Sequence, residues 1–590
     1  MSLTRLDFIT VLLAVGTCVT TDALAQSNWP SAGADLNNSR YQATENQINA
    51  NTVGSLKVKW VFATSGDVQA HPAVDGDYLY FPDSAGFLYK VKKIDGTQVW
   101  KKPISDYTGF TGDSARGTPA VAGDLLILGN LTGRNIPLFG QPNPPPKPAR
   151  VFAVNKNDGS FVWSTKVDET DQAFVTNSPI VYNGTAYVGV ASNEEVISAF
   201  VPKCSPTTPP PPQCWVFQFR GSALALDVQT GVIKWQTFMI PPRPANWSGN
   251  WYAGASIWGS TGAIDPTTNQ IFMTTGNNVS APESVVTCLK NGQPPSSCVD
   301  PADHFDSVVA LDLDTGKINW AARGLPHDLY NVACGINVPG AFTIPVPGVP
   351  GLTPGTYDNC PWSPPGPPTY TDPDEDFAQG PMLLGNGLVG AGQKSGVFWA
   401  FKRNPGGQQG QQQGQLGQQG QQAELVWHTQ VVPGGITGGM QWGSATDGKR
   451  IFVASANSGT RLAGAGSGAV DWTLKDGTKT KAGGWAALDS NTGAVIWTTM
   501  DPTYPTVPNG SRAEGAVSAT NDVVFGCNLA PGIGRMVAMN ANTGAILWSY
   551  DTGAPCNAGA SISDGMVFWG SGTFSGQGPR KLFAFGLPGN

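Results

Sequence analysis

The chain has 590 residues, including 74 glycines and 48 prolines, so these two make up one residue in five where about 12 % is usual. Only 13 % of residues are charged, yet 40 % are hydrophobic and 19 are tryptophan, which excludes an intrinsically disordered chain. The net charge of −7 argues against nucleic acid or an anionic membrane surface as a partner. The excess of glycine and proline predicts many turns. The length allows about four domains, or one long unit built from an internal repeat.

The N-terminus has the pattern of a secretory signal. Residues 8–19 form an apolar run behind Arg5, and residues 23–25 (Ala-Leu-Ala) match the small-residue pattern of a signal-peptidase site. We expect residues 1–25 to be removed and residues 26–590 to form the mature domain. The run is too short to span a bilayer, so we expect no membrane span. The protein is predicted to be secreted, or periplasmic if its host is a bacterium.

The cysteines fit the same compartment. Cleavage would leave eight cysteines, and an even number in an exported chain suggests disulfides, although sequence alone does not fix their connectivity. Proximity along the chain favours four pairs: Cys204–Cys214, Cys288–Cys298, Cys334–Cys360 and Cys527–Cys556. The chain contains no CxxCH haem motif and no CxxC zinc motif.

A phrase of 11 residues returns along the whole chain. Each copy has an apolar strand, a turn with Asp or Asn and then Gly, and a second strand that ends in Trp; the Gly supplies the positive φ of the turn. A further hydrophobic hairpin precedes each copy, for example residues 72–82, so the repeat predicts four strands per unit. The copies are KVKKIDGTQVW (90–100), AVNKNDGSFVW (153–163), ALDVQTGVIKW (225–235), ALDLDTGKINW (310–320), ALDSNTGAVIW (487–497) and AMNANTGAILW (538–548).

Two imperfect copies complete the count. Residues 400–407 begin the phrase and residues 425–427 finish it, with a Gln/Gly-rich insert at 408–422 that we expect to be a mobile loop. The other copy is split, because residues 581–585 match its first strand and residues 56–60 match its Trp strand. A split repeat predicts an all-β, eight-bladed β-propeller whose ring is closed by strands from both termini. We expect one Trp of each blade to pack against the next blade: Trp60, Trp100, Trp163, Trp235, Trp320, Trp427, Trp497 and Trp548.

This repeat resembles that of the pyrroloquinoline quinone (PQQ) alcohol dehydrogenases, and in particular their polyvinyl-alcohol-dehydrogenase-like branch. The resemblance implies a quinoprotein that oxidises primary or secondary alcohols, polyvinyl-alcohol-like substrates among them, with PQQ and Ca²⁺. Without a haem motif, electrons would pass to a separate acceptor, such as a cytochrome c. The closer likeness is carried by residues 28–41, 192–195, 219–231, 252–260, 273–284 and 393–401.

The resemblance also implies where the cofactor and metal would bind. Trp258 in SIWGS matches the family's platform for the flat cofactor; read without the family, it would be a core residue. Ca²⁺ prefers carboxylate and amide oxygens, and the family's ligands match Glu194 or Glu195 in GVASNEE and Asn277 in TTGNN. Because strand side chains alternate, we expect only one of the two glutamates to face the axis. The alternative is a solvated acidic pair.

Four further residues complete the implied site. Arg116 in SARGTP matches the family's arginine, a cation for the cofactor carboxylates. Lys394 in QKSG matches the basic residue near the quinone oxygens, where a fixed cation would stabilise the anion formed as hydride arrives. Thr176 is expected to donate a hydrogen bond to the cofactor, and Gln441 is a further candidate.

The chain departs from the family at two places. It has no adjacent cysteine pair to cover the second cofactor face, and residues 108–117 offer Phe110 or Thr111 instead. The family's catalytic Asp lies in a PxDxWDF phrase, and here Asn331 stands at that position. An amide cannot accept the proton, so Asp328 is the nearest candidate base. In the alternative interpretation Asp328 caps a turn and the chain has lost dehydrogenation.

Other acidic residues are assigned structural places. We expect the stretch at 372–376 (DPDED) to be a solvated loop, and Asp303 and Asp306 to be turn residues. The rival to the enzyme is a non-catalytic propeller that binds protein or polysaccharide through its loops. Asn331 is the residue that separates the two interpretations.

Overall fold

The computed structural model describes eleven stretches of the chain. The predicted signal peptide (1–25), the insert at 408–422, the pairs Cys204–Cys214 and Cys334–Cys360, and Asn331 lie outside these described residues. The described residues are 27–131, 147–198, 215–247, 249–325, 328–330, 374–405, 423–435, 438–458, 469–507, 511–573 and 578–589.

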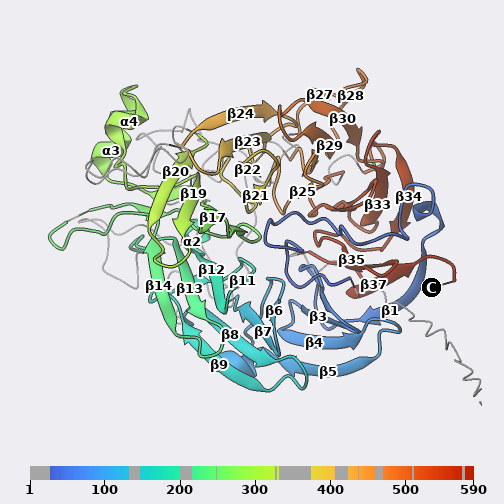
Figure 1. The fold of residues 1–590 in the computed structure, drawn as a ribbon. Helices are drawn as coiled ribbons and strands as arrows, with labels where there is room; N and C mark the ends of the chain where they lie inside the picture. The colour runs from blue at the N-terminus through green and yellow to red at the C-terminus, as the bar shows by residue number, and fades with distance from the viewer. Residues whose placement is uncertain are drawn as a thin grey trace, which may run out of the picture.

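Eight antiparallel sheets stand around a common axis as the blades of a propeller (Figure 1). In the first three blades the strands follow one another outward in chain order. These are β2 (Ala73–Asp75), β3 (Tyr78–Pro82), β4 (Phe87–Lys92) and β5 (Gln98–Pro103); β6 (Ala120–Ala122), β7 (Leu125–Gly129), β8 (Arg150–Asn155) and β9 (Phe161–Lys166); β11 (Ile180–Tyr182), β12 (Thr185–Ser192), β13 (Ser222–Asp227) and β14 (Ile233–Phe238).

The next four blades repeat this order. They contain β16 (Ala263–Asp265), β17 (Gln270–Thr274), β19 (Ser307–Asp312) and β20 (Ile318–Arg323); β21 (Met382–Leu383), β22 (Leu388–Gly392), β23 (Val397–Lys402) and β24 (Leu425–Gln430); β25 (Ala445–Thr446), β26 (Arg450–Ser455), β29 (Gly484–Asp489) and β30 (Val495–Met500); β31 (Ser518–Thr520), β32 (Val523–Cys527), β33 (Arg535–Asn540) and β34 (Ile546–Asp551).

The eighth blade closes the ring with strands from both ends of the chain. Its three inner strands are β35 (Ser561–Ser563), β36 (Met566–Gly570) and β37 (Lys581–Gly586), and its outer strand is β1 (Lys57–Ala63). The two termini pair in antiparallel register, from Lys57 opposite Gly586 to Ala63 opposite Lys581. The predicted eight-bladed propeller and its closure are therefore confirmed.

The repeated tryptophans dock each blade onto the next. In seven blades the indole N–H donates to a backbone carbonyl of the following blade, as from Trp163 to Val228 at 2.9 Å. The ring also lies against the turn glycine of that blade: Gly231 has φ +70°, and a Cβ there would come within 2.5 Å of the Trp163 ring. The TG turn is therefore needed for its backbone conformation and for the packing of the indole. In the eighth case, Trp427, the buried Nε1 has no hydrogen-bond partner in the described part of the chain.

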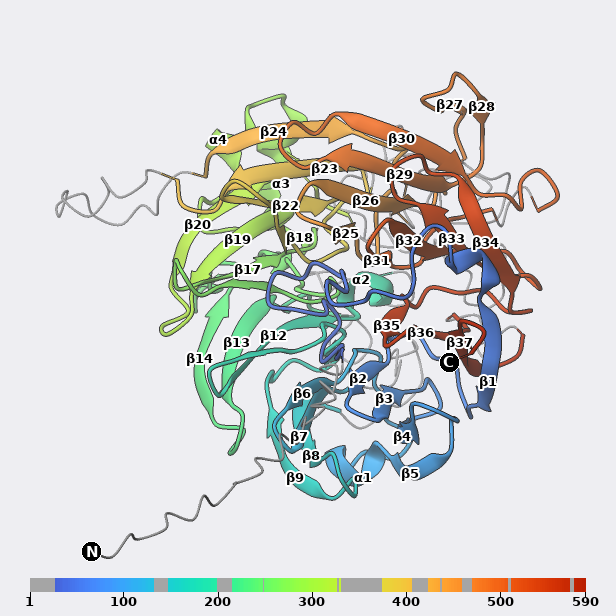
Figure 2. The same cartoon turned by 45° about the vertical axis from the view of Figure 1, so that its right-hand side comes forward.

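Several elements do not belong to the repeat. β10 (Ala173–Phe174) adds a strand beside β12, and β15 (Ala253–Gly254) pairs with β18 (Asn278–Ser280) in a separate sheet. The helix α2 (Glu194–Ile197) follows β12 and lies near the centre of the ring (Figure 2). None of the described helices is long and apolar enough to cross a membrane. The remaining elements outside the repeat are η1 (Val53–Ser55), α1 (Ser105–Thr108), α3 (Glu283–Lys290), α4 (Pro295–Cys298) and the hairpin of β27 (Trp472–Thr473) and β28 (Lys479–Thr480).

The N-terminal segment lies across one end of the ring (Figure 2). Its backbone carbonyls accept hydrogen bonds from the inner strands of separate blades: Leu36 from Ile264, Asn37 from Leu383, Ser39 from Thr446 and Arg40 from Ala519. Arg40 itself is fully buried and donates to Ser260 Oγ at 2.8 Å. This segment ties blades together where their inner edges meet.

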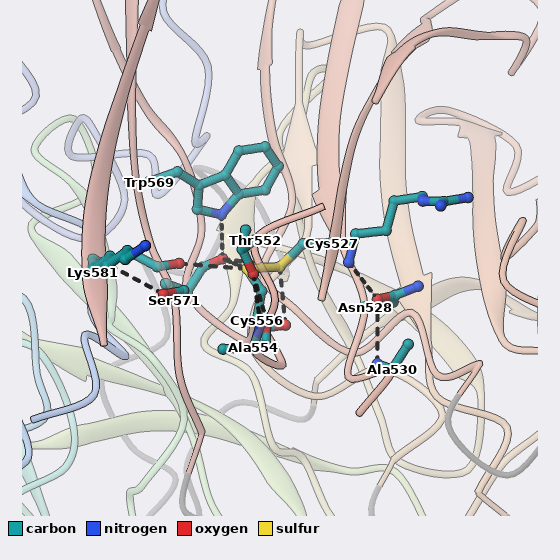
Figure 3. The surroundings of a disulfide bond; sticks show 12 residues. Cys527, Asn528, Ala530, Thr552, Ala554, Cys556, Trp569, Ser571 and Lys581 are labelled. Carbon is teal, nitrogen blue, oxygen red and sulfur yellow. Dashed lines mark hydrogen bonds between the residues drawn. A yellow bond between two sulfur atoms is a disulfide. The ribbon is translucent and has the colours of Figure 1, made fainter. Parts of the chain in front are cut away.

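Two of the four predicted disulfides lie in the described residues and both are confirmed. Cys288–Cys298 joins the end of α3 to α4, and Cys527–Cys556 joins the end of β32 to the segment before β35. Figure 3 shows the second bond beneath the ring of Trp569. Both of its cysteines are buried, so it links two neighbouring blades from within the core.

Candidate active site

A cavity of about 480 Å³ brings together residues from distant parts of the chain. Elements outside the repeat supply much of its wall: Phe174 from β10, Glu195 and Val196 from α2, and Gly254 from β15. The exceptions to the repeat therefore build the cavity. The complete lining is Arg116, Leu131, Phe174, Thr176, Ala191, Ser192, Asn193, Glu195, Val196, Gly254, Ser256, Trp258, Asn277, Val279 and Lys394.

Six of the nine residues proposed from sequence for the cofactor, metal and catalysis line this cavity. Glu194, Gln441 and Asp328 are not in its lining, and neither are Phe110 and Thr111, the proposed cover for the second cofactor face. The six lining residues are Arg116, Thr176, Glu195, Trp258, Asn277 and Lys394.

Lys394 forms the charged centre of the site. Its Nζ lies 2.6 Å from Asp374 Oδ1 and 2.8 Å from Asp376 Oδ1, and all three side chains are buried. Burial alone would lower the pKa of Lys394, but the two carboxylates raise it above its ordinary value, so the amine stays charged. The expectation of a solvated acidic loop is wrong for Asp374 and Asp376, which are 5 % and 1 % exposed. They are buried because they neutralise a buried cation.

Trp258 belongs to the same unit. Its Nε1 donates to Asp376 Oδ2 at 2.9 Å, and Lys394 Nζ lies 4.9 Å from the centre of its ring. Gly276 explains the TTGNN phrase, because a Cβ there would lie 2.7 Å from Asp376 Oδ2 and 3.1 Å from Trp258 Nε1. Asp376 is thus held between a cation and an indole N–H that both belong to the cavity lining, although Asp376 itself does not line the cavity.

Arg116 is held by a second tryptophan. Its guanidinium lies 3.9 Å from the centre of the Trp442 ring, and Trp442 packs edge-on against Trp258 at 5.9 Å. A cation placed over an indole face is stabilised by the ring electrons. Arg116, Thr176 and Trp258 also line a neighbouring cavity of about 40 Å³. Gln441 precedes Trp442 in the chain and is therefore next to the site, although it does not line the larger cavity.

The two adjacent glutamates have different surroundings. Glu194 is fully buried, and its carboxylate accepts the N–H groups of Trp215 at 3.2 Å, Gln218 at 3.1 Å and Phe219 at 3.0 Å. Glu195 lines the cavity, and its carboxylate accepts no hydrogen bond from the described residues. Burial raises the pKa of both to about 7. Only one of them reaches the cavity, but the strand alternation expected from the sequence is not the cause, because both lie on the helix α2.

Asn277 presents an oxygen beside that carboxylate in the lining. Its Nδ2 donates to the carbonyls of Tyr330 at 2.6 Å and Asn278 at 3.2 Å, which fixes the orientation of the amide. The side-chain oxygen accepts no hydrogen bond from the described residues and remains available to a ligand. A carboxylate and an oriented amide oxygen are both ligands that Ca²⁺ prefers.

Family models match two parts of the chain, and known proteins match most of its length. The glucose/ethanol/alcohol dehydrogenase β-propeller family matches residues 212–337, and the outer membrane protein assembly factor BamB family matches residues 414–564. A polyvinylalcohol dehydrogenase of Pseudomonas sp is 24% identical over 578 residues, covering 93% of this chain and 74% of the relative. The chain is a relative of the PQQ-dependent alcohol dehydrogenases.

Further comparisons extend across the whole propeller. The polyvinylalcohol dehydrogenase of Sphingopyxis sp. is 24% identical over 95% of this chain and 71% of its own. The solved structure of the quinohemoprotein alcohol dehydrogenase of Comamonas testosteroni superposes with a TM-score of 0.63 at 18% identity, over 96% of this chain and 81% of that one. A europium-containing methanol dehydrogenase gives 0.60 at 14% identity, over 95% of this chain and 98% of that one. The predicted quinoprotein fold and the resemblance to alcohol dehydrogenases of this family are confirmed.

The residues that line the cavity fit PQQ, the cofactor that the resemblance to these dehydrogenases implies. The cavity offers an indole, a cation at Arg116 and a buried ammonium, which suit a flat aromatic molecule with several carboxylates. No group of three or more His, Cys, Asp and Glu side chains suited to a metal occurs among the described residues. Calcium needs six to eight oxygens, so Glu195 and Asn277 would have to share it with the cofactor and water.

The predicted base, Asp328, occupies a different place from Asp376. It is buried, its backbone carbonyl accepts the Asn278 N–H at 3.2 Å, and its side chain, like that of Asp376, is not in the cavity lining. Asp328, Asp374 and Glu195 together help raise the pKa of Tyr330, whose dominant cause is burial. Asp328 therefore lies near enough to the acidic groups of the site to act on Tyr330 together with them.

Asp374 and Asp376 are the functional candidates that sequence reasoning missed. A signal was present, because Asp376-Phe377 repeats the last two letters of the PxDxWDF phrase immediately before the next blade strand. The intervening residues 327–375 separate this pair from Pro326 and hide the motif. Asp303 and Asp306, expected to be turn residues, are both buried. Asp306 does lie in a turn, with φ +43°, and its carboxylate accepts a hydrogen bond at 2.9 Å from Nε2 of Gln393, the residue before Lys394.

Proposed function

We propose that the protein oxidises the CH–OH group of primary or secondary alcohols with PQQ and Ca²⁺ and passes the electrons to a separate acceptor, such as a cytochrome c. The observation that carries the proposal is that Asp376 contacts both Lys394 and Trp258, two residues that line one cavity. Secretion, or export to the periplasm, is part of the proposal and is supported by the disulfides.

The six residues of the cavity lining that were proposed from the sequence each have a role in this proposal. Trp258 supplies a flat surface for the cofactor, and Arg116 a cation for its carboxylates, while Thr176 donates a hydrogen bond. Glu195 and Asn277 would hold the calcium through their side-chain oxygens. The chemistry supplied by the bound groups would be a hydride acceptor from PQQ and a Lewis acid from Ca²⁺.

Asp376 is the base that the geometry favours. It accepts the hydroxyl proton of the alcohol as the C–H bond breaks, so the proton ends on the carboxylate and the electron pair leaves with the hydride. Lys394 and the Trp258 N–H hold the carboxylate in place before the reaction. Asp328, the base proposed from sequence, remains the competing candidate. The pair can be separated by substitution.

Reconstitution tests the proposal directly. The purified protein is titrated with PQQ in the presence and absence of Ca²⁺, and cofactor binding is followed by quenching of tryptophan fluorescence. Dye reduction is then measured with methanol, ethanol, propan-2-ol and polyvinyl alcohol. Calcium-dependent binding with turnover is expected. Absence of both binding and turnover would favour the rival, a non-catalytic binding propeller.

A further inference from the structure

Two tryptophans beside the cavity each donate their indole N–H to a buried carboxylate. The N–H of Trp258 donates to Asp376 at 2.9 Å. The N–H of Trp442 donates to Glu514 Oε1 at 3.4 Å, and the two rings pack edge-on with their centres 5.9 Å apart. Asp376 has a place in the proposed function, whereas Glu514 has none. Glu514 is nevertheless only 7 % exposed, and a carboxylate is costly to bury unless its charge is compensated.

Arg116 connects Glu514 to the site. Its guanidinium lies over the Trp442 ring, 3.9 Å from the ring centre, and it lines both the large cavity and the neighbouring one of about 40 Å³. Trp442 and Ala516 line the smaller cavity, so the segment that carries Glu514 reaches the same wall. A rotation of the Trp442 indole would remove the surface on which the guanidinium lies. The acceptor of the indole N–H therefore influences the position of a cation in the cavity.

The segment that carries Glu514 is itself fixed on two sides. The backbone N–H of Val517 donates to Gly443 O at 2.9 Å, which joins the segment to the loop of the indole. On the other side, a Cβ at Gly515 would come within 2.5 Å of Cys527 Sγ, so the chain passes closely over the buried disulfide of that cysteine. The carboxylate is therefore presented to the indole by backbone that has little freedom to move.

The Glu514 carboxylate faces cations from three segments of the chain. These are Arg512, Arg116 and Lys394. They favour the charged form, as does the hydrogen bond from Trp442, but burial has the larger influence and raises the pKa of Glu514 to about 7. The charge of the acceptor on the indole N–H therefore changes near neutral pH, which makes the contact measurable.

We propose that Glu514 is a positioning residue of the cofactor site, which holds the Trp442 indole and, through the face of that ring, the Arg116 guanidinium. This inference rests on the proposed function, in which Arg116 supplies a cation for the cofactor carboxylates. Glu514 lines neither cavity and acts through the ring. An arginine that is already in place binds a carboxylate more tightly than one whose competent position is only partly populated.

The first measurement uses the full chain without cofactor. The protein is labelled with 5-fluorotryptophan, and the fluorine NMR signal of Trp442 is identified as the one that Trp442→Phe removes. We expect this signal to shift with pH in the wild type, with a midpoint near 7, and to stay constant in Glu514→Gln. It should move and broaden in Glu514→Leu, whose side chain has no acceptor. A Trp442 signal that is the same in all these proteins would overturn the inference.

Cofactor affinity gives the second readout. PQQ is titrated in the presence of Ca²⁺ by equilibrium dialysis, and Glu514→Leu is compared with Glu514→Gln. Both variants lack the charge, but only glutamine keeps an oxygen that can accept the indole N–H, so the pair isolates the hydrogen bond. We expect Glu514→Leu to bind PQQ about tenfold more weakly, which corresponds to a competent position of Arg116 that is populated about a tenth of the time. Equal affinity in the two variants would overturn the inference.

A matched control separates positioning from a general loss of structure. Glu45 is also buried, accepts the backbone N–H groups of Gln47 at 2.7 Å and Gly565 at 2.8 Å, and lines neither cavity. Glu45→Gln should therefore leave the affinity for PQQ and the Trp442 signal unchanged. A loss of PQQ affinity in Glu45→Gln equal to that in Glu514→Leu would overturn the inference.

A double variant tests whether Glu514 acts through the indole. In the Trp442→Phe background the N–H is already absent, so Glu514→Leu should cost no further affinity for PQQ. A second tenfold loss in this background would overturn the inference. A Trp442 signal that depends on Glu514 in a protein that binds no PQQ would reject the proposed function and keep the hold of Glu514 on the ring.

Discussion

The outer halves of the blades and the wall of the cavity are built on opposite rules. The outer halves repeat one solution, in which an Asp-Gly or Thr-Gly turn receives the indole of the preceding blade, as at Gly96, Gly231 and Gly316. The cavity wall uses elements that occur once, such as β10, α2 and β15. The comparison teaches that the repeat secures the ring, whereas its interruptions carry the polar groups of the site.

One blade shows how an interruption arises. The second strand of the other blades has five or six residues, but β12 has eight and continues to Ser192. The extra length pairs with β10, from Ala173 opposite Ser192, and delivers the chain to α2 at the centre of the ring. Glu195 reaches the cavity because β12 extends beyond the end of its blade and leads directly into α2.

The largest effect on activity is expected at Asp376, which contacts two residues of the cavity wall. Asp376→Asn removes the acceptor of the alcohol proton, and general bases contribute roughly 10²–10⁴-fold, so we expect dye reduction by the reconstituted enzyme to fall by about 10³-fold. Asp328→Asn is the matched variant and should lose less than about tenfold. A greater loss in Asp328→Asn would return the role of base to the residue proposed from sequence.

The next effect belongs to the outer halves of the blades. Trp235→Ala removes a buried indole that donates to Leu313 O at 2.9 Å, and truncation of a buried Trp costs about 3–5 kcal/mol. The unfolding temperature, measured by circular dichroism, should therefore fall. Folded Trp235→Ala protein should keep its affinity for PQQ, since Trp235 does not line the cavity. Loss of PQQ binding without loss of stability would break the separation of the two regions.

The buried Glu194 gives a pH dependence of stability. Burial raises its pKa from 4.5 to about 7, so the folded protein holds a proton that the unfolded chain has lost between these values. Its contribution is therefore full below about pH 4.5 and declines as pH rises toward 7, by on the order of 3 kcal/mol. Glu194→Gln should remove this part of the fall in unfolding temperature between pH 5 and 8. Glu195→Gln should instead weaken calcium-dependent PQQ binding.

The smallest effect compares two docking tryptophans. Trp163 donates to Val228 O, whereas the buried Nε1 of Trp427 has no partner in the described residues. Substitution by Phe removes the N–H in both, so Trp163→Phe should cost about 1 kcal/mol more than Trp427→Phe. Denaturant unfolding measures the difference. Equal losses would show that ring packing, and not the hydrogen bond, holds the blades together.

The sequence by itself determined the scaffold. Period-two strands, the Gly turn and the recurring Trp are local patterns, and each blade needs only its neighbour to bury them, so eight copies, one of them split between the termini, were enough to predict the closed ring. Arg116, Thr176, Trp258, Asn277 and Lys394 were placed by short phrases that resemble a known family. Two disulfides followed from proximity along the chain.

Only the tertiary structure decided which carboxylates belong to the site. Asp374 and Asp376 look like a solvated acidic run in the sequence, because nothing local shows that Lys394 will lie 2.6 Å and 2.8 Å from them. Glu194 and Glu195 are adjacent and chemically alike, and only the N–H groups of Trp215, Gln218 and Phe219 turn one of them away from the cavity. The physical reason is the same in both cases. The state of a buried charge depends on partners that are brought to it from other segments of the chain.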